Sequence, residues 1–156
     1  MDTDLSQLNL DEDYQPSVSS NAPPRRVVSK LEAMFYYAGI SPTPPKLVYR
    51  TGKRPWVKPT GPEAYRQLKQ LRPVFGHKLN DVSKEVGPKI HGILDSHSVS
   101  WISIDVVRFL KGGDREVVGP IVLWIGVLPN SLQAEDAFHS AKDLFDLLAC
   151  FDITDV

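Results

Sequence analysis

Hydrophobic side chains recur every three or four positions in two stretches of the second half of the chain. Residues 134–148 carry one such stripe, which predicts an amphipathic helix capped by Asn130 or Ser131. Residues 79–94 carry the other stripe, which Gly87–Pro88 interrupts. The interruption allows either one kinked helix or two abutting helices.

Around these stretches the pattern changes to that of β-strands. Val99–Leu110 places apolar residues on both faces, and Ile121–Leu128 is apolar throughout, as an interior strand would be. The turn residues Lys111–Asp114 lie between them, which predicts a hairpin. Cys150–Val156 follows the last helix as another strand, so we expect a right-handed crossover that sets it parallel to Ile121–Leu128.

The first half of the chain has shorter patterned segments. Val28–Ala38 has apolar residues at helical spacing and Gly39 at its end, which predicts a short helix. Lys46–Arg50 alternates polar and apolar residues beside several prolines, which is typical of a short edge strand. A further helix is expected from the N-cap Thr60 up to Pro73, which would stop it.

Together these elements predict a single α+β domain over residues 27–156. We expect a small mixed β-sheet, made of the hairpin and one right-handed β-α-β crossover, with three to four helices covering it. The apolar positions of these elements should form one core. The residues assigned to that core are Leu68, Leu71, Val86, Ile90, Leu94, Ile104, Val106, Leu123, Ile125, Phe138, Ala141 and Leu148.

Residues 1–26 differ from the rest of the chain in composition. They are rich in acids, serine and proline, and they have too few apolar side chains to offset the entropy lost on ordering. We therefore predict a disordered acidic arm. Over all 156 residues, 42% are apolar and 24% are charged, which excludes a wholly disordered protein.

Several other classes of protein are also disfavoured. No apolar run approaches the ~18 residues of a membrane helix, and no basic segment of a secretory signal precedes one. The single cysteine, Cys150, excludes an internal disulfide framework and a cysteine-based zinc cluster. We expect a cytoplasmic or nuclear protein that does not enter membranes.

The net charge of the chain is −1, but charge is unevenly distributed along it. Residues 1–22 hold five acids and no base, whereas residues 25–89 hold 14 bases and four acids. Residues 90–156 hold four bases and ten acids. The basic middle of the chain either lies against the acidic parts or meets an external polyanion, and the internal interpretation is preferred.

Catalytic and metal-binding patterns are weak. His91, Asp95 and His97 could converge at a helix end, but a metal needs three or four converging ligands, and a helix terminus explains the same residues. Cys150 lies near acids that would oppose a thiolate. We predict no metal, no cofactor and no catalytic residues. An enzyme with an unrecognised site around Asp95, His97 and Asp105 is the weakest alternative.

The basic segment of residues 46–72 is the strongest feature outside the core. Tyr49, Trp56 and Tyr65 are interleaved with its charges, which is typical of surfaces that contact phosphates and stack on bases. A solvated face explains the same composition and is the preferred interpretation. The candidate binding residues are Arg50, Lys53, Arg54, Trp56, Lys58, Arg66, Lys69 and Arg72.

Five runs of sequence carry a resemblance to a known family: Gly61–Arg66, Leu71–Phe75, Ser103–Phe109, Gly119–Val127 and Pro129–Leu132. Through them residues 46–156 resemble an uncharacterised protein family abundant in fungal genomes. No run is a catalytic signature. Longer members continue into a region faintly similar to trypsin-type peptidases, which is absent here. The resemblance implies a fungal source and an accessory N-terminal domain.

Because the predicted last strand runs to Val156, we expect a module of a longer chain. The favoured function is a non-catalytic protein-interaction or regulatory module of a larger fungal protein, which docks through the basic segment 46–72. Binding of nucleic acid or another polyanion by the same segment is the second interpretation. The sequence does not specify the protein partner or the oligomeric state.

Overall fold

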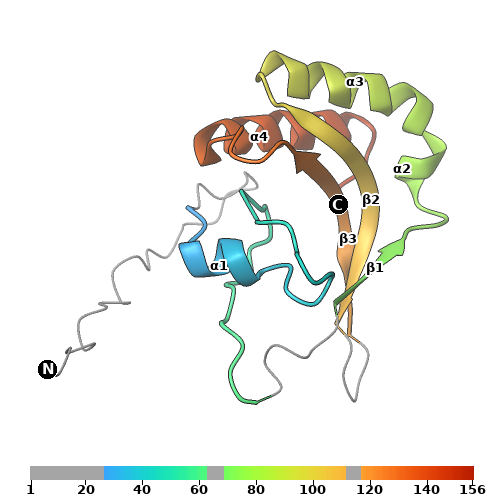
Figure 1. Ribbon diagram of the computed structural model, residues 1–156. Coiled ribbons are helices and arrows are strands. Elements are labelled where there is room, and N and C mark those ends of the chain that lie inside the picture. Colours follow the sequence, from blue (N-terminus) through green and yellow to red (C-terminus); the bar gives the residue numbers. More distant parts are fainter. Residues whose placement is uncertain (1–26, 63–68, 112–116) are drawn as a thin grey trace, which may run out of the picture.

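A computed structural model describes residues 27–62, 69–111 and 117–156 (Figure 1). Those residues form an α+β fold of three strands and four helices, which confirms the predicted class. None of these helices is both long enough and apolar enough to traverse a lipid bilayer. In chain order the elements are α1 (Lys30–Phe35), β1 (Lys69–Pro73), α2 (Lys78–Asp81), α3 (Ser83–Ser96), β2 (Trp101–Lys111), β3 (Val117–Val127) and α4 (Ala134–Cys150).

The three strands form one antiparallel sheet in the order β1-β2-β3. The long β2–β3 hairpin is present as predicted, although the turn residues 112–116 lie outside the described part of the chain. The hairpin register shifts between Trp101 and Ser103 and again between Arg108 and Leu110. Such shifts increase bending and twist, and the sheet is strongly curved in Figure 1.

One face of the sheet packs against α3 and α4. Val86, Ile90 and Leu94 come from the stripe of α3, and Leu144 and Leu148 come from the stripe of α4. They pack against alternate residues of the hairpin, because successive strand side chains point to opposite faces. The hairpin residues in this contact are Trp101, Ile104, Val106, Leu123, Ile125 and Val127.

The other face of the sheet meets the chain that follows α1. The ring of Tyr37 lies 5.6 Å from that of Trp124 and 5.7 Å from that of Phe109, measured between centroids. Ser29 caps α1 by accepting a hydrogen bond from the backbone N–H of Glu32 at 3.1 Å. Gly39 ends the turns after α1 with a φ of +93°, which glycine adopts without strain. The predicted first helix is therefore present, though shorter.

The stripe over residues 79–94 is divided between α2 and α3, but not at the position that the sequence predicted. The break lies at Val82, which has φ −97° and ψ 7°, and not at Gly87–Pro88. Pro88 sits inside α3 on an exposed position, so its ring and the carbonyl it leaves unpaired can face water. At the last helix, Gln133 and not Asn130 or Ser131 is the N-cap of α4.

The predicted helix from Thr60 to Pro73 is wrong over the residues that can be compared. Residues 63–68 lie outside the described part of the chain, but Lys69–Pro73 is the edge strand β1, paired with β2. Pro73 ends this strand at the margin of the sheet, where a missing N–H is tolerated. Leu71 is 39% exposed and does not belong to the core as predicted.

Two predicted strands are also absent. Lys46–Arg50 has no strand pairing. Cys150 is the last residue of α4, and the following turn, with Asp152 at φ +55°, leads Ile153 into the core without joining the sheet. The right-handed crossover and the mixed sheet were therefore wrong, and β3 is an edge strand of the described sheet and not an interior one.

Most of the predicted core is confirmed. Leu71 is the exception just described, and Leu68 lies outside the described residues together with the arm 1–26. Val86, Ile90, Leu94, Phe138 and Leu148 are buried, and Ala141 is half-buried. The four hairpin residues Ile104, Val106, Leu123 and Ile125 are half-buried against the core.

Candidate functional site

The predicted basic surface divides into an inward part and an outward part. Arg50 and Lys69 are partly buried and make contacts inside the fold. Arg72 is exposed on β1, where it donates to the side-chain oxygen of Gln70 at 2.8 Å. Arg66 lies outside the described residues. The remaining candidates, Lys53, Arg54, Trp56 and Lys58, lie in residues 52–60, which we call the basic loop.

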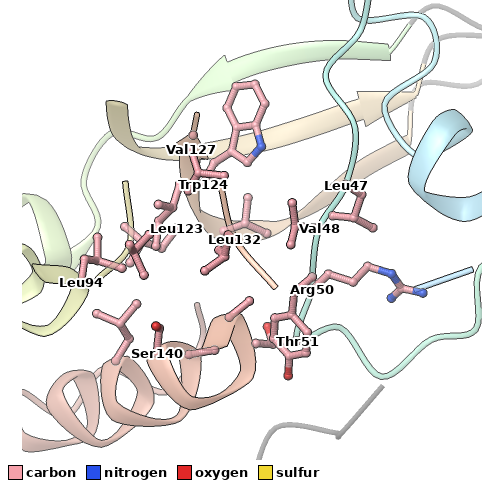
Figure 2. Close-up of a pocket in the computed structure, with 18 of the residues that line it drawn as sticks. Leu47, Val48, Arg50, Thr51, Leu94, Leu123, Trp124, Val127, Leu132 and Ser140 are labelled. Carbon is pink, nitrogen blue, oxygen red and sulfur yellow. The ribbon is translucent and has the colours of Figure 1, made fainter. Parts of the chain in front are cut away.

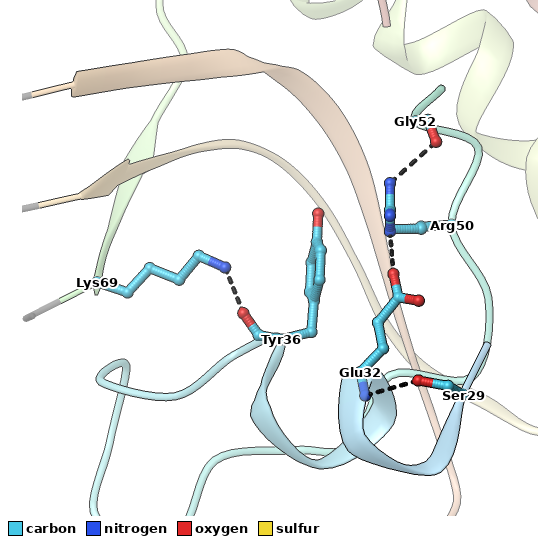
Figure 3. A network of polar contacts seen from close by, with 6 residues as sticks. All are labelled: Ser29, Glu32, Tyr36, Arg50, Gly52 and Lys69. Carbon is cyan, nitrogen blue, oxygen red and sulfur yellow. Dashed lines mark hydrogen bonds and ion pairs between the residues drawn. The ribbon is translucent and has the colours of Figure 1, made fainter. Parts of the chain in front are cut away.

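Arg50 forms a buried ion pair with Glu32 of α1 (Figure 3). The Arg50 Nε donates to Glu32 Oε1 at 2.6 Å, and about nine-tenths of both side chains is buried. The Arg50 Nη1 donates to the carbonyl of Gly52 at 2.9 Å. The Arg50 Nη2 is buried and has no hydrogen-bond partner among the described residues. This pair fixes the start of the basic loop against α1.

Lys69 reaches the same region from β1. Its Nζ donates to the backbone carbonyl of Tyr36 and lies 4.3 Å from the centroid of the Tyr36 ring. It also lies 5.5 Å from the ring of Tyr37 and 5.3 Å from that of Phe109. Figure 3 shows the Tyr36 ring between Lys69 on one side and Arg50 on the other. Both cations therefore serve to hold the turn after α1.

Burial has opposite effects on the ionisable groups of this cluster. Burial, and to a lesser extent the charges of Lys111 and Arg50, lower the pKa of Lys69 to about 8. Burial raises the pKa of Tyr37 to about 12, although the Trp124 Nε1–H donates to the Tyr37 hydroxyl at 3.1 Å. The ring faces and the Tyr36 carbonyl favour the ammonium form of Lys69. Lys69 is still charged at pH 7.

Sequence reasoning missed the role of Glu32. It is the one acid between Asp13 and Glu63. A signal was available, since Val28, Glu32 and Tyr36 recur every four residues and would therefore share one side of the predicted helix Val28–Ala38. An acid on that side needs a buried cation as its partner.

A cavity of about 260 Å³ opens beside β3 (Figure 2). We call it the β3 cavity. Its lining includes Val122–Val127 of β3, the segment Pro45–Thr51 and α4 residues, among them Ser140, and it also reaches the core residues Leu94 and Val99. In Figure 2, Leu47 and Val48 lie across from Leu123 and Trp124, with Ser140 below. The charged residues of this lining are both basic, namely Lys46 and Arg50.

The histidines near α3 have structural partners. His91 stacks on Trp101 with 4.6 Å between the ring centroids. Asp95 accepts from the Trp101 Nε1–H at 3.0 Å, and His97 pairs with Asp143 at 2.7 Å. Within the described ranges, no three histidine, cysteine, aspartate or glutamate side chains converge as a metal site would require.

The other catalytic candidates lie apart from the β3 cavity. Cys150 is exposed at the end of α4, and Asp105 is exposed on β2. No protein-family profile, no curated protein sequence and no solved structure matches this chain.

Proposed function

We propose that this chain is a non-catalytic protein-interaction module of a larger fungal protein, and that its basic segment docks to an acidic partner. The observation that supports this most is the exposure of the basic loop. Lys53, Arg54 and Lys58 are exposed, Val57 is 79% exposed, and Trp56 is half-buried. Exposed cations around apolar side chains are suited to a protein partner with an acidic rim.

The side chains of Arg50 and Lys69 point into the fold, which narrows the set of cations that we propose to contact a partner. Their charges are engaged with Glu32 and with aromatic rings, so they anchor the loop and contribute little to a partner. We propose that docking uses the exposed cations of the basic loop, Lys53, Arg54 and Lys58. Because these charges are exposed, their contribution to affinity should weaken as salt is raised.

Nucleic-acid binding is the second candidate, and Trp56 is the observation that favours it. A half-exposed indole among cations can stack on a base, and such stacking contributes about 1–3 kcal/mol per base. Residues 90–156 carry ten acids against four bases, and this excess would repel a phosphate backbone. We therefore place this candidate behind protein binding.

The test reverses two loop charges, in the double variant Arg54→Glu with Lys58→Glu. The matched control reverses two exposed lysines on helices, Lys84 and Lys142, to glutamate. Binding of an immobilised oligo-glutamate peptide and of a single-stranded oligonucleotide is measured against salt. We expect the loop variant to weaken peptide binding about tenfold or more. The control variant should bind the peptide as the unmodified chain does.

The outcomes separate the two candidates. A sub-micromolar, salt-sensitive complex with single-stranded DNA or RNA, lost in the loop variant, would show that nucleic acid is the ligand. Trp56→Ala supplies an independent measurement. If Trp56 covers the fold, this change lowers the melting temperature and leaves oligonucleotide binding negligible; if Trp56 stacks on a base, it weakens the oligonucleotide complex by about 1–3 kcal/mol.

A further inference from the structure

The lining of the β3 cavity shows which part of β3 faces it. Val122, Leu123, Trp124, Ile125, Gly126 and Val127 all line the cavity, although they are consecutive. Successive strand side chains point to opposite faces of a sheet, so a face of β3 would contribute only every second residue. The cavity therefore runs along the outer edge of β3.

That edge has unpaired backbone groups. β3 pairs with β2 on its inner side. Among the described residues, no backbone hydrogen bond joins residues 117–127 of β3 to any segment other than β2. In an antiparallel pair, alternate residues direct their N–H and C=O groups away from the partner strand. These groups border apolar walls, where leaving them without partners is costly.

The opposite wall of the β3 cavity is a segment outside any helix or strand. Pro45–Thr51 closes the far side of the β3 cavity without strand pairing of its own. On α4 the floor includes three small side chains, Ala137, Ser140 and Ala141. The six β3 residues span ~20 Å at ~3.4 Å per residue, so an extended peptide of about six residues would match the edge.

Charge restricts the sequence of such a peptide. Lys46 and Arg50 are the charged residues of the lining, and acids are absent from it among the described residues. Arg50 keeps Glu32 as its partner, and in Figure 2 its guanidinium points away from the cavity. Lys46 is exposed. An acidic residue on the incoming peptide would be complementary to Lys46.

We propose that the β3 cavity binds an extended segment of a partner protein, which adds to the outer edge of β3 as a fourth strand. The segment has apolar side chains at alternate positions and an acidic residue near Lys46. Backbone hydrogen bonds to β3 supply affinity, and the apolar walls select the alternate side chains. This inference rests on the proposed protein-interaction function and names the mode of contact.

The experiment uses the full chain and a synthetic peptide with blocked ends, in which valine alternates with threonine after two aspartates. Titration calorimetry measures binding, and NMR measures hydrogen exchange of the β3 amides. A second peptide of the same sequence carries N-methyl groups at alternate residues, which removes the hydrogen bonds of one edge. We expect slower exchange at residues 122–127 with the first peptide. The N-methylated peptide should bind at least about tenfold more weakly.

Two protein variants locate the binding site. Ala141→Phe fills the floor of the β3 cavity, and Ala149→Phe makes the same change at an exposed position of α4 outside it. We expect Ala141→Phe to weaken peptide binding about tenfold or more and Ala149→Phe to leave it unchanged. Circular dichroism melting verifies that each variant folds. If Ala141→Phe does not fold, the comparison of the two peptides still shows whether binding depends on backbone hydrogen bonds to β3.

Several outcomes would overturn the proposal. No binding of the first peptide, or equal binding of both peptides, would exclude a hydrogen-bonded strand. Protection of β3 that appears as the protein alone is concentrated would mean that a second copy occupies the edge. Loss of partner binding in the charge-reversed loop variant, with no binding of the alternating peptide, would leave the proposed function standing while this mode of contact fails.

Discussion

Glu32 shows how one residue can decide the orientation of a whole segment. Its carboxylate is buried and pairs with Arg50 at 2.6 Å, and its backbone N–H is capped by Ser29. A buried charge without a partner is costly, so each member of the pair requires the other. The pair therefore holds residues 45–52 against α1.

The first prediction concerns this ion pair. Glu32→Ala leaves the guanidinium of Arg50 buried without its counter-charge, so we expect the free energy of unfolding to fall by about 3 kcal/mol. The double variant Glu32→Gln with Arg50→Met removes both charges and should recover much of that loss. Urea unfolding measures both effects. Equal losses in the single and double variants would contradict the prediction.

The second prediction concerns Lys69 and pH. Its pKa is lowered from 10.5 to about 8, so above pH 8 the unfolded chain binds more protons than the folded one. The free energy of unfolding should therefore rise between pH 8 and about pH 10. Above pH 10 the raised pKa of Tyr37 acts in the opposite direction.

Melting temperatures measured by calorimetry between pH 8 and pH 10 test this trend. Lys69→Met should remove most of the rise, because methionine has no proton to lose. Lys84→Met makes the same change at an exposed lysine, and the rise in stability between pH 8 and pH 10 should remain in this variant. A rise of the same size in both variants would show that Lys69 is not its source.

At the scale of elements, two glycines differ in the space available for a side chain. A Cβ at Gly92 of α3 would meet no atom within 4 Å, whereas a Cβ at Gly119 of β3 would lie 2.7 Å from the carbonyl oxygen of Phe109. We predict that Gly92→Ala stabilises the fold by about 0.5–1 kcal/mol through helix propensity. Gly119→Ala should destabilise it by about 1–3 kcal/mol, because backbone must move. Chemical denaturation compares the two, and equal stabilities would contradict the contrast.

The sequence predicted the elements whose own pattern is long and regular. The stripes of α3 and α4 and the two 11-residue strands of the hairpin repeat often enough to identify helix and strand. β1 has only five residues, which is too short for the apolar spacing to distinguish a helix from a strand. Leu68 and Leu71 are three positions apart, which also suits a helix. Only the pairing of β1 with β2 decides between helix and strand. The apolar residues at 150–156 suggested a strand, but Ile153 is buried in the core, and its backbone N–H donates to the carbonyl of Leu148 in α4 and not to a strand.

The candidate site was predicted less well, for a physical reason. Composition identified the basic segment, but the outward or inward direction of a cation depends on contacts with residues distant in the chain. Arg50 meets Glu32, 18 positions earlier, and Lys69 meets Tyr36, 33 positions earlier. The β3 cavity was missed because it lies between segments that the chain brings together only on folding.

At the scale of the whole molecule, the acidic residues 1–22 and the basic loop carry opposite charge. We predict that deleting residues 1–22 strengthens retention on heparin at low salt, since five negative charges no longer compete for the loop. A full-length chain with those five acids changed to their amides is the matched control and should show the same gain. Unchanged retention in both would exclude competition by this segment.

The three tryptophans of this chain occupy three different environments. Trp56 lies in the basic loop, Trp101 stacks on His91 beside α3, and Trp124 donates to Tyr37 at the β3 cavity. Indole emission responds to polarity and to nearby rings, so each residue should have its own spectrum. In a variant that keeps only Trp56, tryptophan fluorescence would report on the basic loop alone. In a variant that keeps only Trp124, it would report on the edge of β3 alone. The fold therefore contains its own optical probes for both proposed contacts.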